Sequence, residues 1–443
     1  MRFIADFHIH SKYSRATARN MDLENLDKWA KIKGIKVLGT GDFTHPEWFK
    51  ELKEKLEPAE PGLFKLKKND FSKQKEPGVK EKETRFVLTA EISCIYSTRA
   101  AARVKEESLL SSLNDKKVRK IHILIFAPCF EVVEKINTQL GWIGNLKSDG
   151  RPILGLDAKE LVKIVLNASK KCLIIPAHAW TPWFSIFGSK SGFDSIEECF
   201  GDYSKYIYAI ETGLSSDPVM NWRLSALDKV ALISNSDAHS PAKLGREANV
   251  FDLELSYESI VEAIKTKNPQ KFLYTVEFYP EEGKYHFDGH RNCGIVLSPK
   301  ESKKYNKICP VCGKALTIGV LSRVEELADR PENFKPKNSI PFKSLVPLEE
   351  IIADSLGQNT GTKEVEKRYG ELIEKIGSEF NVLLESSQEE LEKSTLPEIA
   401  QAIIKVRKGE VTREPGYDGV FGKIRIFCPS LEKKKPTKQD TLF

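Results

Sequence analysis

Short apolar runs that end at or beside a histidine or an acidic residue recur through the first half of this chain. Their β-rich composition predicts strands, and helical patterns lie between several of them. One such pattern, Asp22 to Gly34, has a capping aspartate and a terminal glycine, and another is Ser256 to Lys267. Strands that alternate with helices and carry polar residues at their carboxyl ends predict an α/β fold, here a β/α barrel. The runs are Arg2 to His8, Ile35 to Thr40, Arg85 to Ala90, Ile121 to Phe126, Cys172 to Ala177 and Val230 to Ser236.

The polar residues at these strand ends predict a site that binds several metal ions. Side chains alternate along a strand, so His8 and His10 face the same side and can hold one cation. A single histidine at a strand end is usually structural. Several ionisable groups buried around one point would each cost on the order of several kcal/mol without a cation, which favours metal. The mixed nitrogen and oxygen donors suit zinc, manganese or iron. The expected ligands are His8, His10, Asp42, Glu91, His122, His178, Asp237 and His239.

A second metal site is predicted by two pairs of ligands separated by a short loop. His290 and Cys293 form the first pair, and Cys309 and Cys312, in Cys309-Pro310-Val311-Cys312-Gly313, form the second. Each tight turn presents two donors to one ion, as tetrahedral structural zinc requires. His286 is an alternative to His290, although its spacing to Cys293 fits less well. A disulfide is the other alternative, but nothing indicates export.

The candidate ligands resemble those of the polymerase and histidinol phosphatase (PHP) superfamily. This resemblance implies a distorted seven-stranded β/α barrel with two to three metals that hydrolyses phosphoesters. It also implies one metal on His8, His10, Glu91 and Asp237, a second on Glu91, His122 and His178, and a third on Asp42 and His239. Two departures affect the third metal: Phe43 stands where the family commonly has histidine, and no histidine lies near Ala16. His45 could substitute, but its Thr-His-Pro context favours a structural turn.

A narrower resemblance to the endonuclease Q family covers nearly the whole chain. It implies an enzyme that nicks double-stranded DNA on the 5′ side of deaminated bases (uracil, hypoxanthine, xanthine) and abasic sites, leaving 3′-hydroxyl and 5′-phosphate ends. The loop Glu211 to Asp217 also matches, so Asp217 is a candidate catalytic residue beside Asp237 and His239; its alternative role is a turn before Pro218. The matching segments are Gly39-Thr40-Gly41-Asp42, Pro176-Ala177-His178-Ala179, Thr181-Pro182-Trp183, Ser234-Asn235-Ser236-Asp237-Ala238-His239-Ser240-Pro241, Leu244-Gly245-Arg246-Glu247 and the Cys309 to Gly313 turn.

An enzyme that acts on a single damaged base needs a pocket for it. Uracil and hypoxanthine offer a carbonyl beside a ring N–H, where cytosine and adenine offer an amino group beside an acceptor, so a matched pocket can discriminate strongly. The base must be flipped out and stacked on apolar walls. Trp180, Trp183 and Phe184 follow His178 and are the predicted walls, with packing in the core as the alternative.

The length predicts a barrel with smaller appended parts. We expect the phosphoesterase barrel at residues 1–280, the zinc-binding module at 281–325, a helical C-terminal domain at 326–428 and a flexible tail at 429–443. Lys50 to Arg85 and Ser97 to Lys120 are expected as solvated excursions, the second a candidate for phosphate contact through its basic residues. The role of residues 416–426 does not follow from the sequence.

The last residues suggest a protein partner. Gln439, Leu442 and Phe443 follow a lysine-rich run and resemble the short peptide by which repair proteins bind DNA sliding clamps. The chain begins directly with a strand and has no apolar run of membrane-spanning length, so a cytoplasmic protein is expected.

Two other functions use the same residues. A PHP-type phosphatase for a small phosphomonoester would need the metals but not the zinc module or the tail. A DNA adaptor without catalysis would have lost ligands, whereas this set is nearly intact. The net charge of +6 decides nothing, because a positive stripe matters more than the total.

Overall fold

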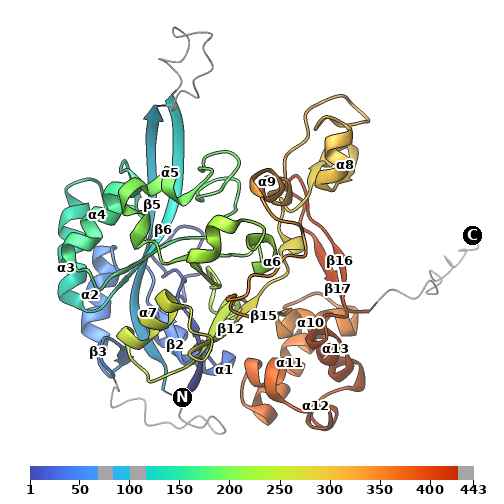
Figure 1. Cartoon of the computed structure of the whole chain (residues 1–443). Coiled ribbons are helices and arrows are strands. Elements are labelled where there is room, and N and C mark those ends of the chain that lie inside the picture. The colour runs from blue at the N-terminus through green and yellow to red at the C-terminus, as the bar shows by residue number, and fades with distance from the viewer. Residues whose placement is uncertain (68–82, 100–115, 428–443) are drawn as a thin grey trace, which may run out of the picture.

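A mixed sheet forms the centre of the molecule. The computed structural model describes residues 1–67, 83–99 and 116–427. Its strands are β1 (Arg2–Asp6), β2 (Val37–Gly39), β3 (Leu56–Pro58), β4 (Phe64–Leu66), β5 (Arg85–Arg99), β6 (Lys116–Ala127), β7 (Ile153–Leu154), β8 (Leu173–Pro176), β9 (Ala209–Glu211), β10 (Ala231–Ile233), β11 (Ala248–Asp252), β12 (Phe272–Glu277), β13 (Asp288–His290), β14 (Ile295–Leu297), β15 (Phe342–Ser344), β16 (Thr412–Glu414) and β17 (Lys423–Arg425). The main sheet runs β15-β12-β11-β1-β2-β5-β4-β3, and β6, β7 and β8 join it through β5 and β6 (Figure 1).

Helices surround this sheet and fill the C-terminal part. They are α1 (Leu23–Lys33), α2 (Pro46–Lys55), α3 (Phe130–Gly141), α4 (Ala158–Ala168), α5 (Ile196–Phe200), α6 (Pro218–Asn221), α7 (Tyr257–Thr266), α8 (Pro299–Lys304), α9 (Val320–Leu327), α10 (Leu348–Leu356), α11 (Lys363–Ile376), α12 (Gln388–Ser394) and α13 (Pro397–Arg407). In the described part of the chain, none of them combines the length and apolar composition needed to cross a bilayer.

Local sequence signals placed the early elements correctly. The Asp22 side chain accepts a hydrogen bond from the Asn25 backbone at the start of α1, and Gly34 ends the helix in the left-handed conformation, with φ 88°. Ser256 caps α7 in the same way. A strand is present in each predicted run, and the prediction of a mixed α/β fold is confirmed.

The strands do not all pair in parallel, and two segments that were expected as excursions are described only in part. The regular parallel order of a β/α barrel is interrupted, because β1 pairs in parallel with β2 but antiparallel with β11, and β6 is antiparallel to both β5 and β8. Of the segment from Lys50 to Arg85, residues 50–67 include most of α2 and the β3–β4 pair, and residues 68–82 lie outside the described residues. Strands β5 and β6 pair as far as Arg99 opposite Lys116 and form a projecting ribbon (Figure 1), and residues 100–115 of the Ser97 to Lys120 segment lie outside the described residues.

The C-terminal part is helical but tied to the sheet. Helices α10 to α13 pack together below the β16–β17 ribbon (Figure 1). Strand β15, just before them, pairs in parallel with β12. Residues 416–426 connect the regions. Tyr417 forms a β-bridge with Phe287 of the predicted zinc module, and Ile426 donates its backbone N–H to Asp354 of α10 at 3.1 Å.

A buried aromatic cluster fixes the strand that precedes the first histidines. Phe7 packs edge-on against Phe126 with ring centroids 5.2 Å apart and lies 6.1 Å from Phe251. Because neighbouring side chains point to opposite faces of an extended chain, burial of Phe7 and Ile9 on one side sends His8 and His10 to the other.

Candidate metal centre

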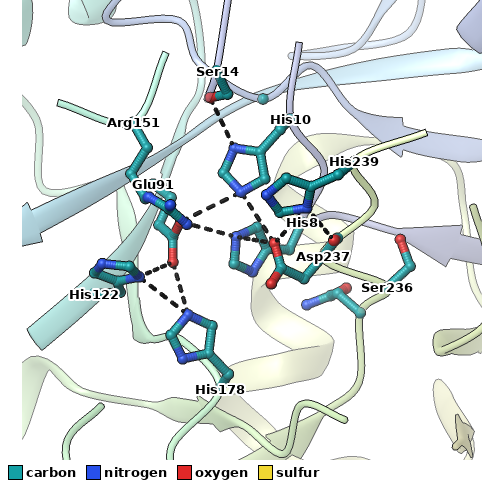
Figure 2. A network of polar contacts seen from close by, with 12 residues as sticks. His8, His10, Ser14, Glu91, His122, Arg151, His178, Ser236, Asp237 and His239 are labelled. Carbon is teal, nitrogen blue, oxygen red and sulfur yellow. Dashed lines mark hydrogen bonds and ion pairs between the residues drawn. The ribbon is translucent and has the colours of Figure 1, made fainter. Parts of the chain in front are cut away.

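The two histidines after β1 lie at the centre of a buried cluster of nitrogen and oxygen donors. His8 and His10 have no exposed surface. The His10 backbone N–H donates to the Ala238 carbonyl at 3.0 Å, which holds the β1 end beside Asp237 and His239. His10 Nε2 then lies 3.0 Å from Asp237 Oδ1 (Figure 2). This backbone hydrogen bond therefore brings His8 and His10 next to Asp237 and His239, which lie far away in the sequence.

Carboxylates behind the histidines set their orientation. His8 Nδ1 lies 2.9 Å from Glu211 Oε2, and His10 Nδ1 lies 3.0 Å from Asp42 Oδ1. In both rings this leaves Nε2 facing the centre. Metal-binding histidines usually have this arrangement, in which the outer nitrogen donates to a carboxylate and the inner one is free to ligate.

His8 Nε2 provides the test of whether a metal fits. It is buried and has no hydrogen-bond partner within the described residues, and it lies 3.6 Å from Glu91 Oε2 and 3.7 Å from Asp237 Oδ1. A buried polar atom without a partner costs about 1–3 kcal/mol. A cation between this nitrogen and the two carboxylates would satisfy it, so the donor set fits a divalent metal.

Glu91, on β5, joins the two halves of the cluster. Its Oε1 lies 2.9 Å from His122 Nδ1 and 3.0 Å from His178 Nε2, while its Oε2 faces His8 and His10. Burial alone would raise the pKa of Glu91, but its neighbours, His122 first and then the permanently charged Arg151, hold it well below its ordinary value. A carboxylate with both oxygens so placed can bridge two metal ions.

The donor atoms converge in three overlapping groups. Within each, one ligand atom per residue lies within 4.8 Å of the others. The groups are His8, His10 and Glu91; Glu91, His122 and His178; and His10, Asp237 and His239.

Electrostatics in the cluster favour ionised carboxylates. Burial disfavours the charged form of His10, yet Asp42 and its other acidic neighbours raise its pKa well above the ordinary value. His122 behaves differently, because burial outweighs its attraction to Glu91 and lowers its pKa to about 4. His122 is therefore neutral at physiological pH, the form in which imidazole binds metal.

Three of the expected ligands have strained backbones. Asp42, His178 and Asp237 have φ values of 50°, 30° and 47°. Non-glycine residues adopt this region at a cost of about 1–3 kcal/mol each, and such strain gathers at functional sites. Here it turns each side chain back toward the cluster at the end of its strand.

Asp42 is placed differently from what the resemblance implied. It is fully buried and accepts from the Ser11 backbone and from the Ser11 and Ser14 hydroxyls, in addition to its contact with His10. His239 instead lies beside His10, with ring centroids 4.5 Å apart. His45 stacks on Tyr13 at 4.4 Å and belongs to none of the three groups.

Asp217 begins the short helix α6. Its side chain accepts from the Met220 backbone at 2.8 Å, the geometry of the turn-forming alternative. Burial raises its pKa to about 6, with Glu281 contributing.

A cavity of about 360 Å³ opens beside His122 and His178. Trp183 and Phe184 line it, as the sequence predicts for a base pocket, and Tyr285, Lys284 and Ser215 add further walls. Trp180 does not line it: it is buried, donates to Asn221 at 2.8 Å and packs on Phe187. Trp180 therefore packs in the core, which was the alternative to a place in the pocket wall.

The zinc-type ligands also converge. Ligand atoms of His290, Cys293, Cys309 and Cys312 lie within 4.8 Å of one another, on the β13–β14 hairpin and a facing turn. Although desolvation opposes it, backbone N–H groups of Cys312 and Val311 lower the pKa of Cys309 to about 6, which favours the thiolate that binds zinc. His286 stacks on Phe287 and is not part of this group.

Two residues at the centre were missed by sequence reasoning. Glu211 ends β9 and contacts His8, the His178 backbone at 2.8 Å and Asn235 at 2.9 Å. It obeys the same strand-end pattern as the expected ligands and could have been found by it. Arg151 reaches Glu91 from a loop with no such signal, at 3.1 Å (Figure 2).

Other predicted features lie elsewhere. Arg119, proposed for phosphate contact, is buried and paired with Glu198 at 2.8 Å. Gln439, Leu442 and Phe443 fall outside the described residues.

One family model and two relatives are similar to this chain in sequence. The family model of the MJ0043 C-terminal domain matches residues 347–410. An uncharacterized protein of Methanocaldococcus jannaschii, MJ0043, is 38% identical over 263 residues; the match covers 58% of this chain but about a third (32%) of that protein's length. The uncharacterized protein YqxK of Bacillus subtilis is 28% identical, over 96% of this chain and 99% of its own.

Two crystal structures are similar over almost the whole chain. The lesion-specific endonuclease PfuEndoQ from Pyrococcus furiosus is 31% identical, with a TM-score of 0.80 over 96% of this chain and 95% of its own. A complex of endonuclease Q with a 27-mer duplex substrate, which has an abasic lesion at the active site, is also 31% identical, with a TM-score of 0.78 over 96% of both chains.

Proposed function

Because the chain belongs to the endonuclease Q family, we propose that it is a DNA repair endonuclease that hydrolyses the phosphodiester 5′ to a deaminated base or an abasic site. The products are a 3′-hydroxyl and a 5′-phosphate on the damaged nucleotide. The observation that carries this proposal is the buried cluster in which His8 Nε2, which has no hydrogen-bond partner in the described part of the chain, faces Glu91 and Asp237. The likeness to a complex with lesion-containing duplex supports double-stranded DNA as the partner.

The metal centre would hold two or three divalent ions, with zinc, manganese or iron as candidates. We assign His8, His10, Glu91 and Asp237 to one ion and Glu91, His122 and His178 to a second. The second set is one of the converging groups, and the first adds Asp237 to the group of His8, His10 and Glu91. His239 would serve a third, with His10 and Asp237 as its neighbours. Ions held there would lower the pKa of a water molecule and neutralise charge on the scissile phosphate.

The protein's own groups orient and shield this centre. Glu211 and Asp42 hold the imidazole rings of His8 and His10 with Nε2 inward. Asp237 and His239 are partly exposed, with 26% and 31% of their side chains accessible, so they lie where a phosphate can enter. We propose them as the catalytic residues that face the substrate, and Asp217 as a further acidic candidate.

The cavity beside His122 and His178 is the proposed pocket for the flipped base. Trp183 and Phe184 would replace the stacking that the base loses on leaving the duplex. Its volume of about 360 Å³ would accommodate one base, and a base bound there would lie beside His122 and His178, which also line the cavity.

The remaining parts are assigned by the same proposal. Residues 1–280 form the distorted PHP barrel, 281–325 the zinc-binding module on His290, Cys293, Cys309 and Cys312, and 326–428 the helical domain. The tail, 429–443, would bind a DNA sliding clamp through Gln439, Leu442 and Phe443.

A nicking assay tests the proposal. Protein loaded with manganese or zinc is given a labelled duplex with one deoxyuridine, an undamaged duplex, and a small phosphomonoester. We expect one nick 5′ to the deoxyuridine, mapped by product ends. Turnover of the ester with intact DNA would favour a phosphatase instead. Asp237→Asn should abolish nicking and leave DNA binding unchanged, whereas a DNA adaptor would show binding without nicking in both proteins.

A further inference from the structure

Arg151 brings a permanent positive charge into the cluster of candidate ligands. Its Nη1 lies 3.1 Å from Glu91 Oε2, and 25% of its side chain is exposed. Figure 2 shows it on the opposite side of the Glu91 carboxylate from His122 and His178. The Arg151 side chain thus contacts the cluster and is partly exposed to solvent.

The backbone around Arg151 is anchored on both sides. Its N–H donates to Asp149 Oδ1 at 3.2 Å, and the next residue, Pro152, accepts from the Ser93 backbone on β5 at 3.0 Å. Asp149 also accepts from the Arg15 backbone at 3.2 Å. The side chain is therefore aimed at the cluster by a loop tied to the strand that carries Glu91.

Glu91 Oε2 lies where it can interact with two cations, a metal ion and the Arg151 guanidinium. It belongs to the group with His8 and His10 that would hold a metal ion, and it is the same oxygen that Arg151 contacts. An arginine cannot lose its proton to relieve repulsion from a nearby divalent ion. The repulsion is relieved when an anion lies between them.

A phosphodiester is an anion of the required shape. The planar guanidinium presents parallel N–H groups that match the oxygens of a phosphate, which a lysine ammonium does not do. On the basis of the function proposed above, we propose that Arg151 binds a non-bridging oxygen of the scissile phosphate and competes with divalent ions for Glu91 when no phosphate is bound.

Two binding measurements test this inference without relying on activity. Arg151→Gln should bind Mn²⁺ several-fold more tightly than wild type, because a competing cation is removed. The manganese-loaded variant should bind inorganic phosphate at least tenfold more weakly. Arg15→Gln is the matched control, since Arg15 contacts the same loop through Asp149 but is 73% exposed, and it should match wild type in both measurements.

Arg151→Lys separates charge from shape and serves if Arg151→Gln fails to fold. It should retain part of the phosphate affinity but not all of it. Phosphate binding equal to wild type in a folded Gln or Lys variant would overturn the inference. In the nicking assay, Arg151→Gln should raise KM for damaged duplex and lower kcat, with Arg15→Gln unchanged.

A failure of this inference can be distinguished from a failure of the proposed function. If wild type nicks no DNA but the phosphate affinities differ as predicted, the endonuclease proposal fails and Arg151 remains an anion-binding residue. If wild type nicks DNA and Arg151→Gln binds phosphate normally, only the Arg151 inference fails.

Discussion

Glu211→Gln is the substitution that most sharply tests how the centre is organised. Glu211 is fully buried and accepts three hydrogen bonds, from His8 Nδ1, the His178 backbone and Asn235. Glutamine has one acceptor oxygen, and its amide group would direct N–H bonds at one of these donors. The change keeps the shape of the side chain and removes its charge.

The expected magnitudes follow from these contacts. Loss of one charge-assisted hydrogen bond costs about 1.5–3 kcal/mol of folding stability. The glutamine amide would also place an N–H group against another N–H donor, which lowers the stability further. A carboxylate behind a ligating histidine typically contributes 10–100-fold to metal affinity. We therefore expect Glu211→Gln to bind Mn²⁺ about 10–100-fold more weakly and to unfold at a lower temperature.

Chelator-competition titration measures the affinity, and calorimetric unfolding without added metal measures the stability. Glu277→Gln is the matched control, because Glu277 is also fully buried but hydrogen-bonds to Thr212 and to Thr275 rather than to a candidate ligand. It should leave metal affinity within about twofold of wild type. A folded Glu211→Gln variant with wild-type affinity would refute the role of Glu211 in orienting His8.

Three further predictions concern other parts of the molecule. Burial raises the pKa of Glu277 to about 8 from 4.5, so between these pH values the folded protein holds a proton that the unfolded chain releases. The free energy of unfolding should therefore fall as pH rises between about 5 and 8. Glu277→Gln should flatten this part of the curve of unfolding temperature against pH, and an unchanged slope would contradict the raised pKa. Trp183→Ala should lower kcat/KM roughly tenfold or more for a deoxyuridine duplex, since base stacking contributes about 1–3 kcal/mol, and much less for an abasic duplex, which has no base to stack; equal losses on both would argue against a base pocket at this cavity. Cys309→Ser should lose about one zinc per chain in elemental analysis while retaining the metals of the barrel, and an unaltered zinc content would exclude the second site.

Strand-end patterns identified residues that converge, because alternation along a strand decides which side chains share a face. The shared direction of His8 and His10 followed from this rule, whereas Glu91, His122 and His178 were proposed because they lie in or directly after predicted strands. The rule does not say how far behind a face a residue lies: Asp42, which was expected as a metal ligand, contacts the outer nitrogen of His10.

Long-range pairing and side-chain direction could not be predicted. The antiparallel contacts of β11 and β6 depend on packing between distant segments, and no local signal in Ala248–Asp252 or Lys116–Ala127 gives their direction. Trp180 and Trp183 are three residues apart in one aromatic run, yet one is buried and the other is 41% exposed in the cavity wall. Their difference arises from the turn between them.

The central claim is that residues from separate strand ends form one centre for divalent ions. Anomalous diffraction from crystals grown with Mn²⁺ tests it most directly. We predict two or three peaks, one among His8, His10, Glu91 and Asp237 and another among Glu91, His122 and His178. A well-ordered crystal with these side chains in place and no anomalous peak among them, at saturating manganese, would contradict the account.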